Sequence, residues 1–324
     1  MRIAFLVDER NYERYCRQIP EGWEITHFGN GDYAPERLVN TQAQAILIDP
    51  MLPLKGEIIG RMKALKIIQS FGVGYNQIDL QAAAEAGVYV CNNAGVNAAA
   101  VAEQTILLIL AVLRNYHEAE AMTYLARQGE YKGLCFAKGL KELGECKVGL
   151  GGLGAIVKEV ALRLVPFGCQ VYYHKPHRLP EPNPWQVIYS ELDELLTTCD
   201  IVSLHLPVTP DSINIINSQT IEKMKDGAIL VNTSRGELVD QNAVCQALKS
   251  GKLGGFGADT LAPEPVQPDN PIINVPEELR NRVALSPHIG GITAGTFHRS
   301  YRRAIENMKK ALNGERPDHV VNSL

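Results

Sequence analysis

The chain has 324 residues, of which 45% are hydrophobic and 21% charged, with a formal net charge of −4 and a pI of about 6.1. This length and composition predict a globular protein of about two domains, without the basic excess that a nucleic-acid partner requires. Seven cysteines without a C-x-x-C pair indicate reduced thiols in a cytoplasmic protein, and a metal site is not expected. The longest apolar stretch is too short to span a membrane, and the N-terminus lacks the features of a signal peptide.

Short apolar runs alternate with amphipathic segments in the first part of the chain. Strands are predicted over residues 3–7, 45–48, 67–70 and 88–91, and helical segments over 35–40 and 80–86. This alternation is typical of βαβ units and a parallel sheet. Residues 98–115 form a long helical pattern that is apolar almost all round, so we expect a largely buried helix there.

A second alternating series follows residues 129–144, a glycine-rich segment that we expect to be irregular. Its strands are predicted over 147–151, 170–174, 201–205, 228–232, 255–259 and 283–285. Its helices are predicted over 156–167, 192–197, 218–224 and 241–250, and a final amphipathic helix over 297–313. The predicted fold class is therefore α/β, with two doubly wound, Rossmann-like units built on parallel sheets.

The glycine-rich turn KVGLGGLGAIVKEV can be read as a dinucleotide-binding fingerprint in two registers, one that begins at Gly149 and one that begins at Gly152. Only one of them suits a dinucleotide phosphate. The fingerprint needs a strand before it and a helix after it, because the pyrophosphate binds the free N–H groups at the helix start. The register that begins at Gly152 satisfies this rule and predicts Gly152, Gly154, Ala155 and Ile156 as cofactor-binding residues. Val157 replaces the usual third glycine, and we hypothesise that it fills the space that Gly151 leaves.

The cofactor preference is predicted from the end of the next strand. Lys175 lies about 20 residues after Gly154, where an acidic residue usually binds the ribose 2′-hydroxyl of NAD. Lys175 and Arg178, with His174 and His177, form a basic string that favours a 2′-phosphate, so we expect NADP over NAD. Glu181 is a nearby acidic residue that reduces the positive potential of this string. The simpler alternative is a solvated basic loop that does not determine the cofactor.

Three loops that each follow a predicted strand of the second series bear the residues for catalysis. They offer a guanidinium from Arg235, a carboxylate from Glu264 and an imidazole from His288. In open α/β sheets ligands bind at the carboxyl ends of the strands, so these loops can converge. Reduction of a 2-keto acid requires a cation that forks onto the carboxylate, a proton donor, and a partner that orients that donor.

The segments SFGVGYNQID, GVNAAAVAEQT and LHLPVTPDS, the glycine turn and the three loops occur in an order that resembles the D-isomer-specific 2-hydroxyacid dehydrogenase family. The resemblance extends over essentially the whole chain. It implies that Arg235 binds the substrate, that His288 donates the proton in reduction, and that Glu264 pairs with His288. It also implies further substrate-binding and cofactor-lining positions: Val73 and Gly74 for the substrate carboxylate, and Thr105, Leu206, Pro207, Thr233 and Asp259 for the cofactor.

The same resemblance implies a domain layout and partners. The substrate-binding domain would comprise residues 1–97 and 294–324, and the dinucleotide-binding domain residues 98–293, with the active site in the interdomain cleft. The substrate would be a small 2-keto or 2-hydroxy acid of the glyoxylate, hydroxypyruvate or D-lactate type. A homodimer would form through the cofactor domain, with the helix over 98–115 at the contact.

Two alternatives remain open at this point. The first is an NAD-dependent phosphoglycerate-type dehydrogenase, which Asn97 slightly favours because it matches an asparagine of that group. The second is a non-catalytic dinucleotide-sensing protein, as in corepressors that share this fold. The identity of the 2-keto acid and the direction of the reaction are not predicted.

Overall fold

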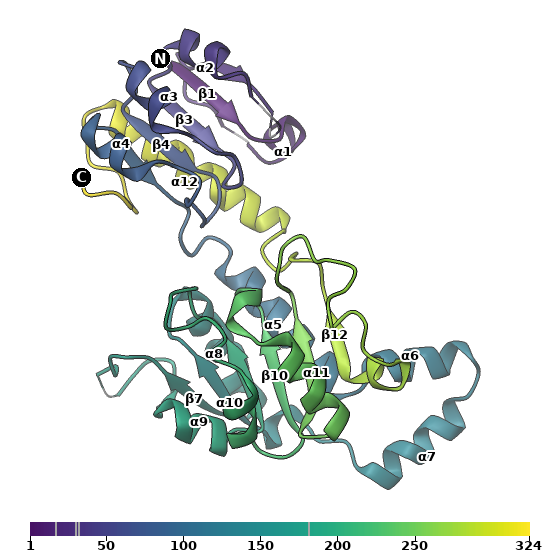
Figure 1. Cartoon of the computed structure of the whole chain (residues 1–324). Coiled ribbons are helices and arrows are strands. Elements are labelled where there is room, and N and C mark those ends of the chain that lie inside the picture. The colour runs from purple at the N-terminus through teal and green to yellow at the C-terminus, as the bar shows by residue number, and fades with distance from the viewer. Residues whose placement is uncertain (17, 30, 32, 181) are drawn as a thin grey trace. The chain divides into compact units, whose positions relative to one another are not determined.

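The computed structural model describes residues 1–16, 18–29, 31, 33–180 and 182–324, so Glu181 lies outside the described residues. The chain forms two compact units, Met1–Asn97 with Ile292–Leu324, and Ala98–Gly291 (Figure 1). The functional assignments, substrate binding for the first unit and dinucleotide binding for the second, stay predictions.

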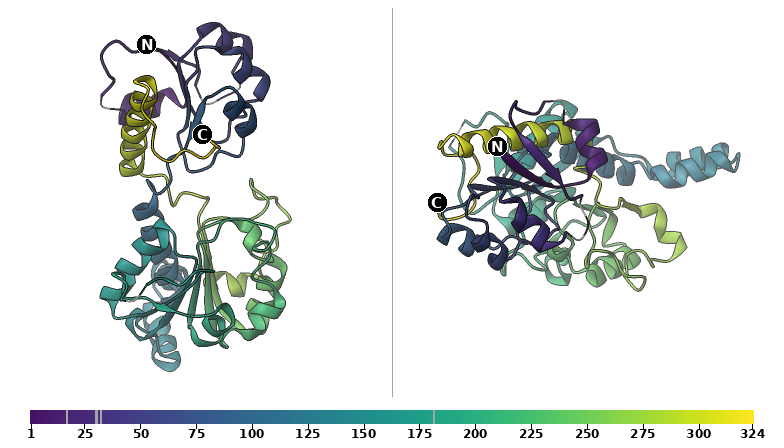
Figure 2. Two further views of the ribbon diagram at one scale, coloured as in Figure 1. Left: turned by 90° about the vertical axis from the view of Figure 1, so that its left-hand side faces the viewer. Right: turned by 90° about the horizontal axis from the view of Figure 1, so that it is seen from above.

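The first unit is a five-stranded parallel sheet in the order β2-β1-β3-β4-β5. Its strands are β1 (Arg2–Leu6), β2 (Glu24–His27), β3 (Ala45–Ile48), β4 (Ile67–Ser70) and β5 (Tyr89–Cys91). Its helices are α1 (Glu9–Tyr15), α2 (Pro35–Thr41), α3 (Gly56–Arg61), α4 (Leu80–Glu85) and α12 (Ala294–Leu312). Helices α1 and α12 cover one face and α2 to α4 the other (Figure 2). The edge strand β2 was not predicted, because its sequence EITH is largely polar and none of its residues is fully buried.

The second unit is a seven-stranded parallel sheet in the order β12-β11-β10-β9-β6-β7-β8. Its strands are β6 (Lys147–Gly151), β7 (Gln170–His174), β8 (Ile188–Tyr189), β9 (Ile201–Leu204), β10 (Ala228–Asn232), β11 (Leu253–Ala258) and β12 (Val283–Leu285). Helices α5 (Ala98–Leu113) and α8 (Ala155–Leu164) pack on one face, and α9 (Leu192–Thr198), α10 (Ser218–Lys223) and α11 (Gln241–Ser250) on the other (Figure 2). The predicted α/β class with two parallel sheets is confirmed.

A helix covers most of residues 129–144, the segment expected to be irregular, and an unpredicted helix precedes it. Helices α6 (Tyr116–Tyr124) and α7 (Gln128–Lys138) form an arm that extends from the rest of the second unit (Figure 1). Neither helix contains a buried residue, and two glycines in α7 lower its helix propensity.

Helix α5 is the buried helix that the sequence predicts. Nine of its sixteen residues are buried, and five of them lie in the core that α5 shares with α8 and the sheet: Ala102, Ile106, Leu108, Ile109 and Val112. Within the described residues no single helix is long and apolar enough to cross a membrane. Helices α5 and α6 reach that length and composition only as a pair, and the chain bends by 64° between them.

Candidate active site

The glycine turn adopts the register that begins at Gly152. Strand β6 ends at Gly151, and Gly154 is the N-cap of α8, without a side-chain capping bond. Gly152 has a φ of +102°, and a side chain there would lie 2.8 Å from the carbonyl oxygen of His205. At Gly154 a Cβ atom would meet nothing within 4 Å. The open space beside the unpaired N–H groups of Ala155 and Ile156 fits a pyrophosphate.

The hypothesis that Val157 fills space left by Gly151 is wrong. A Cβ atom on Gly151 would contact Leu204 and Leu206 at ordinary distances of 3.5 and 3.7 Å, and Val157 is not among its nearest neighbours. The close approach in this strand occurs at Gly149, where a Cβ atom would lie 2.5 Å from Leu195 of α9. Gly149 therefore allows α9 to pack closely on the sheet.

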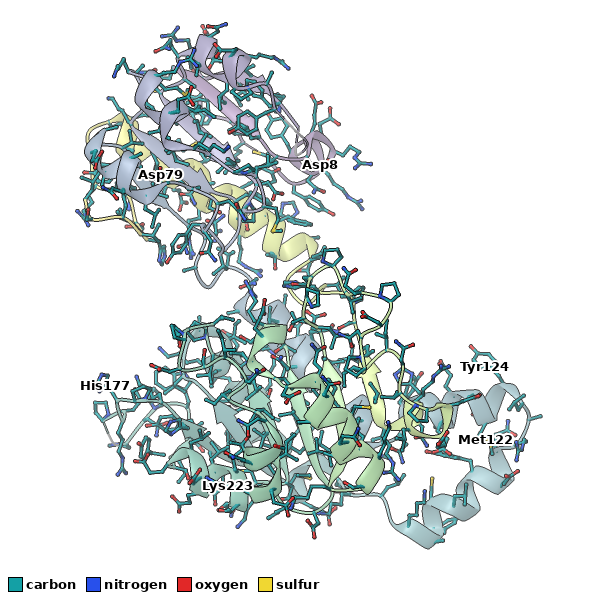
Figure 3. The ribbon with its side chains drawn as sticks, in the orientation of Figure 1. Asp8, Asp79, Met122, Tyr124, His177 and Lys223 are labelled. Atoms are coloured by element: carbon teal, nitrogen blue, oxygen red, sulfur yellow. The ribbon has the colours of Figure 1, made fainter. Side chains whose placement is uncertain are left out.

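The basic residues after β7 differ in their surroundings. The ring of His174 already has a hydrogen-bond partner, because its Nδ1 atom lies 3.1 Å from the carbonyl oxygen of Ser190. The Arg178 guanidinium lies over the Tyr189 ring, 5.5 Å from its centroid. His177 lies in the exposed loop that extends from the unit (Figure 3). Among the described residues no carboxylate forms an ion pair with Lys175, so its charge remains available to a ligand.

The three catalytic candidates follow three neighbouring strands. Arg235 follows β10, Glu264 follows β11, and His288 follows β12. Because these strands are parallel, their carboxyl ends lie at one edge of the sheet. The Nδ1 atom of His288 lies 2.6 Å from Oε1 of Glu264, and the two side chains are 43% and 42% exposed. This bond leaves Nε2 of His288 available to a substrate.

Arg235 lies at the same end of the sheet, and in the part of the chain that the structure describes its guanidinium forms no hydrogen bond or ion pair with Glu264 or His288. Its Nη1 atom donates to the carbonyl oxygen of Ser234 at 2.8 Å, and Asn232 holds its backbone oxygen, also at 2.8 Å. No described carboxylate forms an ion pair with its exposed guanidinium, which can therefore bind a carboxylate ligand through two parallel bonds.

The predicted cofactor-lining residues differ in their exposure to solvent: some are buried and others lie at the surface. Thr105 is fully buried, and its hydroxyl donates to the carbonyl oxygen of Val101 and lies 2.9 Å from Oγ1 of Thr233. Thr105 therefore contacts the side chain of Thr233, and it has no exposed surface that could contact a cofactor. Leu206 and Pro207 are partly or fully exposed after β9, whereas Asp259 is only 3% exposed after β11.

His205 is a neighbouring residue that the sequence analysis did not single out. Its Nε2 atom lies 2.9 Å from Oγ of Ser203 and its Nδ1 atom 3.5 Å from Oγ1 of Thr233. Burial lowers the pKa of His205 to about 4, so the ring is neutral at physiological pH. The available signal was the pair of polar residues, Ser203 and His205, at the end of an otherwise apolar strand.

In the first unit, the loop after β4 is held by its carbonyl groups. Ser70 Oγ donates to the carbonyl oxygen of Gly74 at 2.6 Å, and Asn92 Nδ2 donates to that of Val73 at 2.8 Å. The N–H groups of Val73 and Gly74 have no hydrogen-bond partner among the described residues. They are free to bind an anion, although their role with the substrate stays a prediction.

Comparisons with known proteins identify the family of this chain. Residues 106–290 match the family model described as "D-isomer specific 2-hydroxyacid dehydrogenase, NAD binding domain". A glyoxylate reductase from Korarchaeum cryptofilum is 34% identical over 99% of this chain and 96% of its own length. A hydroxypyruvate reductase from Thermotoga maritima is 36% identical over 84% of this chain and 85% of its own length.

Solved structures with the same fold include a D-2-hydroxyisocaproate dehydrogenase, with a TM-score of 0.87 and 24% identity over the full length of both chains. A protein from Thermus thermophilus has a TM-score of 0.80 and 33% identity over 99% of this chain and all of its own. The chain belongs to the D-isomer specific 2-hydroxyacid dehydrogenase family, as its motifs predicted. It is an oxidoreductase that transfers a hydride between a nicotinamide cofactor and a small 2-hydroxy or 2-keto acid.

Proposed function

We propose that the protein reduces a small 2-keto acid of the glyoxylate or hydroxypyruvate type to the 2-hydroxy acid, with the D configuration where the product is chiral. The relatives named for these two substrates, from Korarchaeum and Thermotoga, support this class. The observation on which the proposal depends is the bond between His288 and Glu264. The same end of the sheet bears Arg235, whose guanidinium forms no ion pair with a carboxylate of the described residues.

The roles follow from the chemistry of each side chain. Arg235 binds the substrate carboxylate and polarises the carbonyl group, because a guanidinium presents two parallel donors and stays charged. His288 gives the proton on Nε2 to the carbonyl oxygen, and Glu264 fixes the ring by accepting from Nδ1. When bound, the nicotinamide cofactor supplies the hydride. The free N–H groups of Val73 and Gly74, in the first unit, bind the substrate carboxylate in the same proposal.

The cofactor would be held at the glycine turn by the backbone of Gly152, Gly154, Ala155 and Ile156, with Leu206, Pro207, Thr233 and Asp259 along its length. NADP is the proposed cofactor. Lys175 has no described ionic partner, and Arg178 is exposed nearby, so both can bind a 2′-phosphate.

A homodimer through the second unit is part of the proposal. Helices α6 and α7 bear large exposed apolar side chains, including Tyr124 at 85% and Phe136 at 89% exposure. Figure 2 shows this arm extending well away from the sheet of its own unit. A second copy that packs on the arm would bury these side chains. A cytoplasmic location, in keeping with seven free cysteines, is proposed with it.

The proposal is tested with purified protein and a panel of glyoxylate, hydroxypyruvate, pyruvate and 3-phosphohydroxypyruvate, each with NADPH and with NADH. We expect the highest kcat/KM with one of the first two acids, and D-glycerate as the product from hydroxypyruvate. A preference for the phosphorylated acid would instead support the phosphoglycerate-type alternative. Binding of the reduced cofactor without turnover of any 2-keto acid at any pH would support the sensor.

A further inference from the structure

The backbone of His288 adopts a conformation that its surroundings must maintain. Its φ is +55°, in the left-handed region that residues other than glycine rarely occupy. Such a conformation persists only where neighbouring contacts hold it. The orientation of the His288 ring therefore depends on the groups that fix its loop.

Asp259 provides most of these contacts. Its carbonyl oxygen accepts from the N–H of His288 at 2.7 Å. Its carboxylate accepts from the next two N–H groups of the loop, Ile289 at 3.0 Å and Gly290 at 2.8 Å. Asp259 is almost fully buried, and no described cation forms an ion pair with it. Its charge is therefore balanced by hydrogen-bond donors of the loop.

Gln104 extends this chain of contacts to α5. Ser286 Oγ donates to Asp259 Oδ1 at 2.5 Å, and Gln104 Nε2 donates to Ser286 Oγ at 2.8 Å. Because the side-chain nitrogen of Gln104 can only donate, Ser286 Oγ accepts from it. The hydroxyl proton of Ser286 must then point at the carboxylate of Asp259. The packing is close as well, because a Cβ atom on Gly290 would lie 2.8 Å from Asp259 Oδ2 and 3.3 Å from Gln104 Cβ.

The next residue on α5 makes a parallel connection to the other catalytic loop. Thr105 Oγ1 lies 2.9 Å from Oγ1 of Thr233, two residues before Arg235. Two consecutive residues of one buried helix thus contact the loop with the proton donor and the loop with the cation.

We propose that Gln104 is a positioning residue, which orients His288 through Ser286 and Asp259. The inference rests on the proposed function, in which His288 donates the proton. It predicts that loss of the Gln104 amide impairs the proton-transfer step and leaves cofactor binding nearly unchanged. Gln104 does not contact the glycine turn, and the variant retains Asp259 with its bonds to the backbone of the His288 loop.

The test compares Gln104→Met, which keeps the length of the side chain and removes the donor, with Gln219→Met on the exposed surface of α10. For Gln104→Met we expect kcat to fall about tenfold, with a changed pH profile of kcat and a larger solvent deuterium isotope effect. The Kd of the reduced cofactor, measured by fluorescence, should stay within about twofold. Ser286→Ala should reproduce these changes, Ser286→Thr should restore the activity, and Gln219→Met should change nothing. An unchanged kcat in both Gln104→Met and Ser286→Ala would overturn the inference.

A double-mutant cycle separates this inference from the proposed function. In a His288→Asn background, Gln104→Met should cause no further loss of kcat, because the residue that it positions is gone. If His288→Asn is impaired and Gln104→Met lowers kcat by the same factor in both backgrounds, the positioning role is wrong and the proposed function stands. If His288→Asn retains the full kcat, the proposed function fails and the inference fails with it.

Discussion

His288 and Glu264 are joined by a 2.6 Å contact between Nδ1 and Oε1, although they come from loops after two different strands. Glu264→Gln preserves the size of the partner and removes its charge. We expect kcat for reduction to fall about tenfold or more, because the protonated ring loses its counter-charge. Steady-state kinetics from pH 5 to 10 check this, with Glu237→Gln, an exposed residue of the same unit, as the control.

Arg235→Lys tests the need for a forked donor at the end of β10. A lysine retains the charge but cannot form two parallel bonds to one carboxylate. The loss of one charged hydrogen bond, about 1.5–3 kcal/mol, corresponds to roughly a 10- to 100-fold drop in kcat/KM for the 2-keto acid. Binding of the reduced cofactor, followed by fluorescence, should not change. A variant with full kcat/KM would contradict the assignment of the substrate carboxylate to Arg235.

Lys175→Glu tests the cofactor preference. A carboxylate at this position repels a 2′-phosphate and can accept from a 2′-hydroxyl. We expect kcat/KM for NADPH to fall at least about tenfold and that for NADH to fall much less or to rise. Lys249→Glu, an equal charge change on the exposed surface of α11, should leave the ratio of the two values unchanged. A wild-type enzyme that already prefers NADH would refute the preference for NADP.

His205 makes the stability of the fold depend on pH. Its folded pKa of about 4 lies below the usual value of 6.5, so the unfolded chain binds a proton first as the pH falls. Stability is therefore lost as the pH falls from 6.5 towards 4, by up to about 1.4 kcal/mol per pH unit. The difference between urea midpoints at pH 7 and pH 5 should be smaller in His205→Asn than in the wild type. Equal differences in the two proteins would show that other groups cause the acid sensitivity.

The exposed arm of α6 and α7 predicts the oligomeric state. Charged replacements at its two most exposed aromatic residues, Tyr124→Lys with Phe136→Lys, should shift the protein from dimer to monomer. Sedimentation velocity at several protein concentrations measures this shift. Met51→Lys, an equally exposed apolar position of the first unit, should leave the dimer intact. A wild-type protein that sediments as a monomer would refute the proposed homodimer.

Local patterns predicted the parts of the site that are determined within short segments. The register of the glycine turn followed from the strand before Gly152 and the helix after Gly154, and both are present. The common sheet edge of Arg235, Glu264 and His288 followed from their positions after parallel strands. The family resemblance supplied their pairing, which spacing alone does not determine.

The features that the sequence did not predict are of two kinds: contacts between segments distant in the chain, and helices that lie on the surface. Gln104 and Ser286 are 182 residues apart in the chain, and their hydrogen bond has no signature in the sequence near either residue. The network of His205 likewise draws on α5 and on β10 through Thr105 and Thr233. Helices α6 and α7 were missed for a different reason, because neither contributes a buried residue to the core and α7 contains two glycines.

The adjacent positions of Gln104 and Thr105 on α5 have a mechanical consequence. A small rotation or shift of that helix displaces the two loops that it contacts by similar amounts. The separation between the imidazole and the guanidinium then changes less than the position of either group alone. A movement of α5 would therefore displace the His288 loop and the Arg235 loop together.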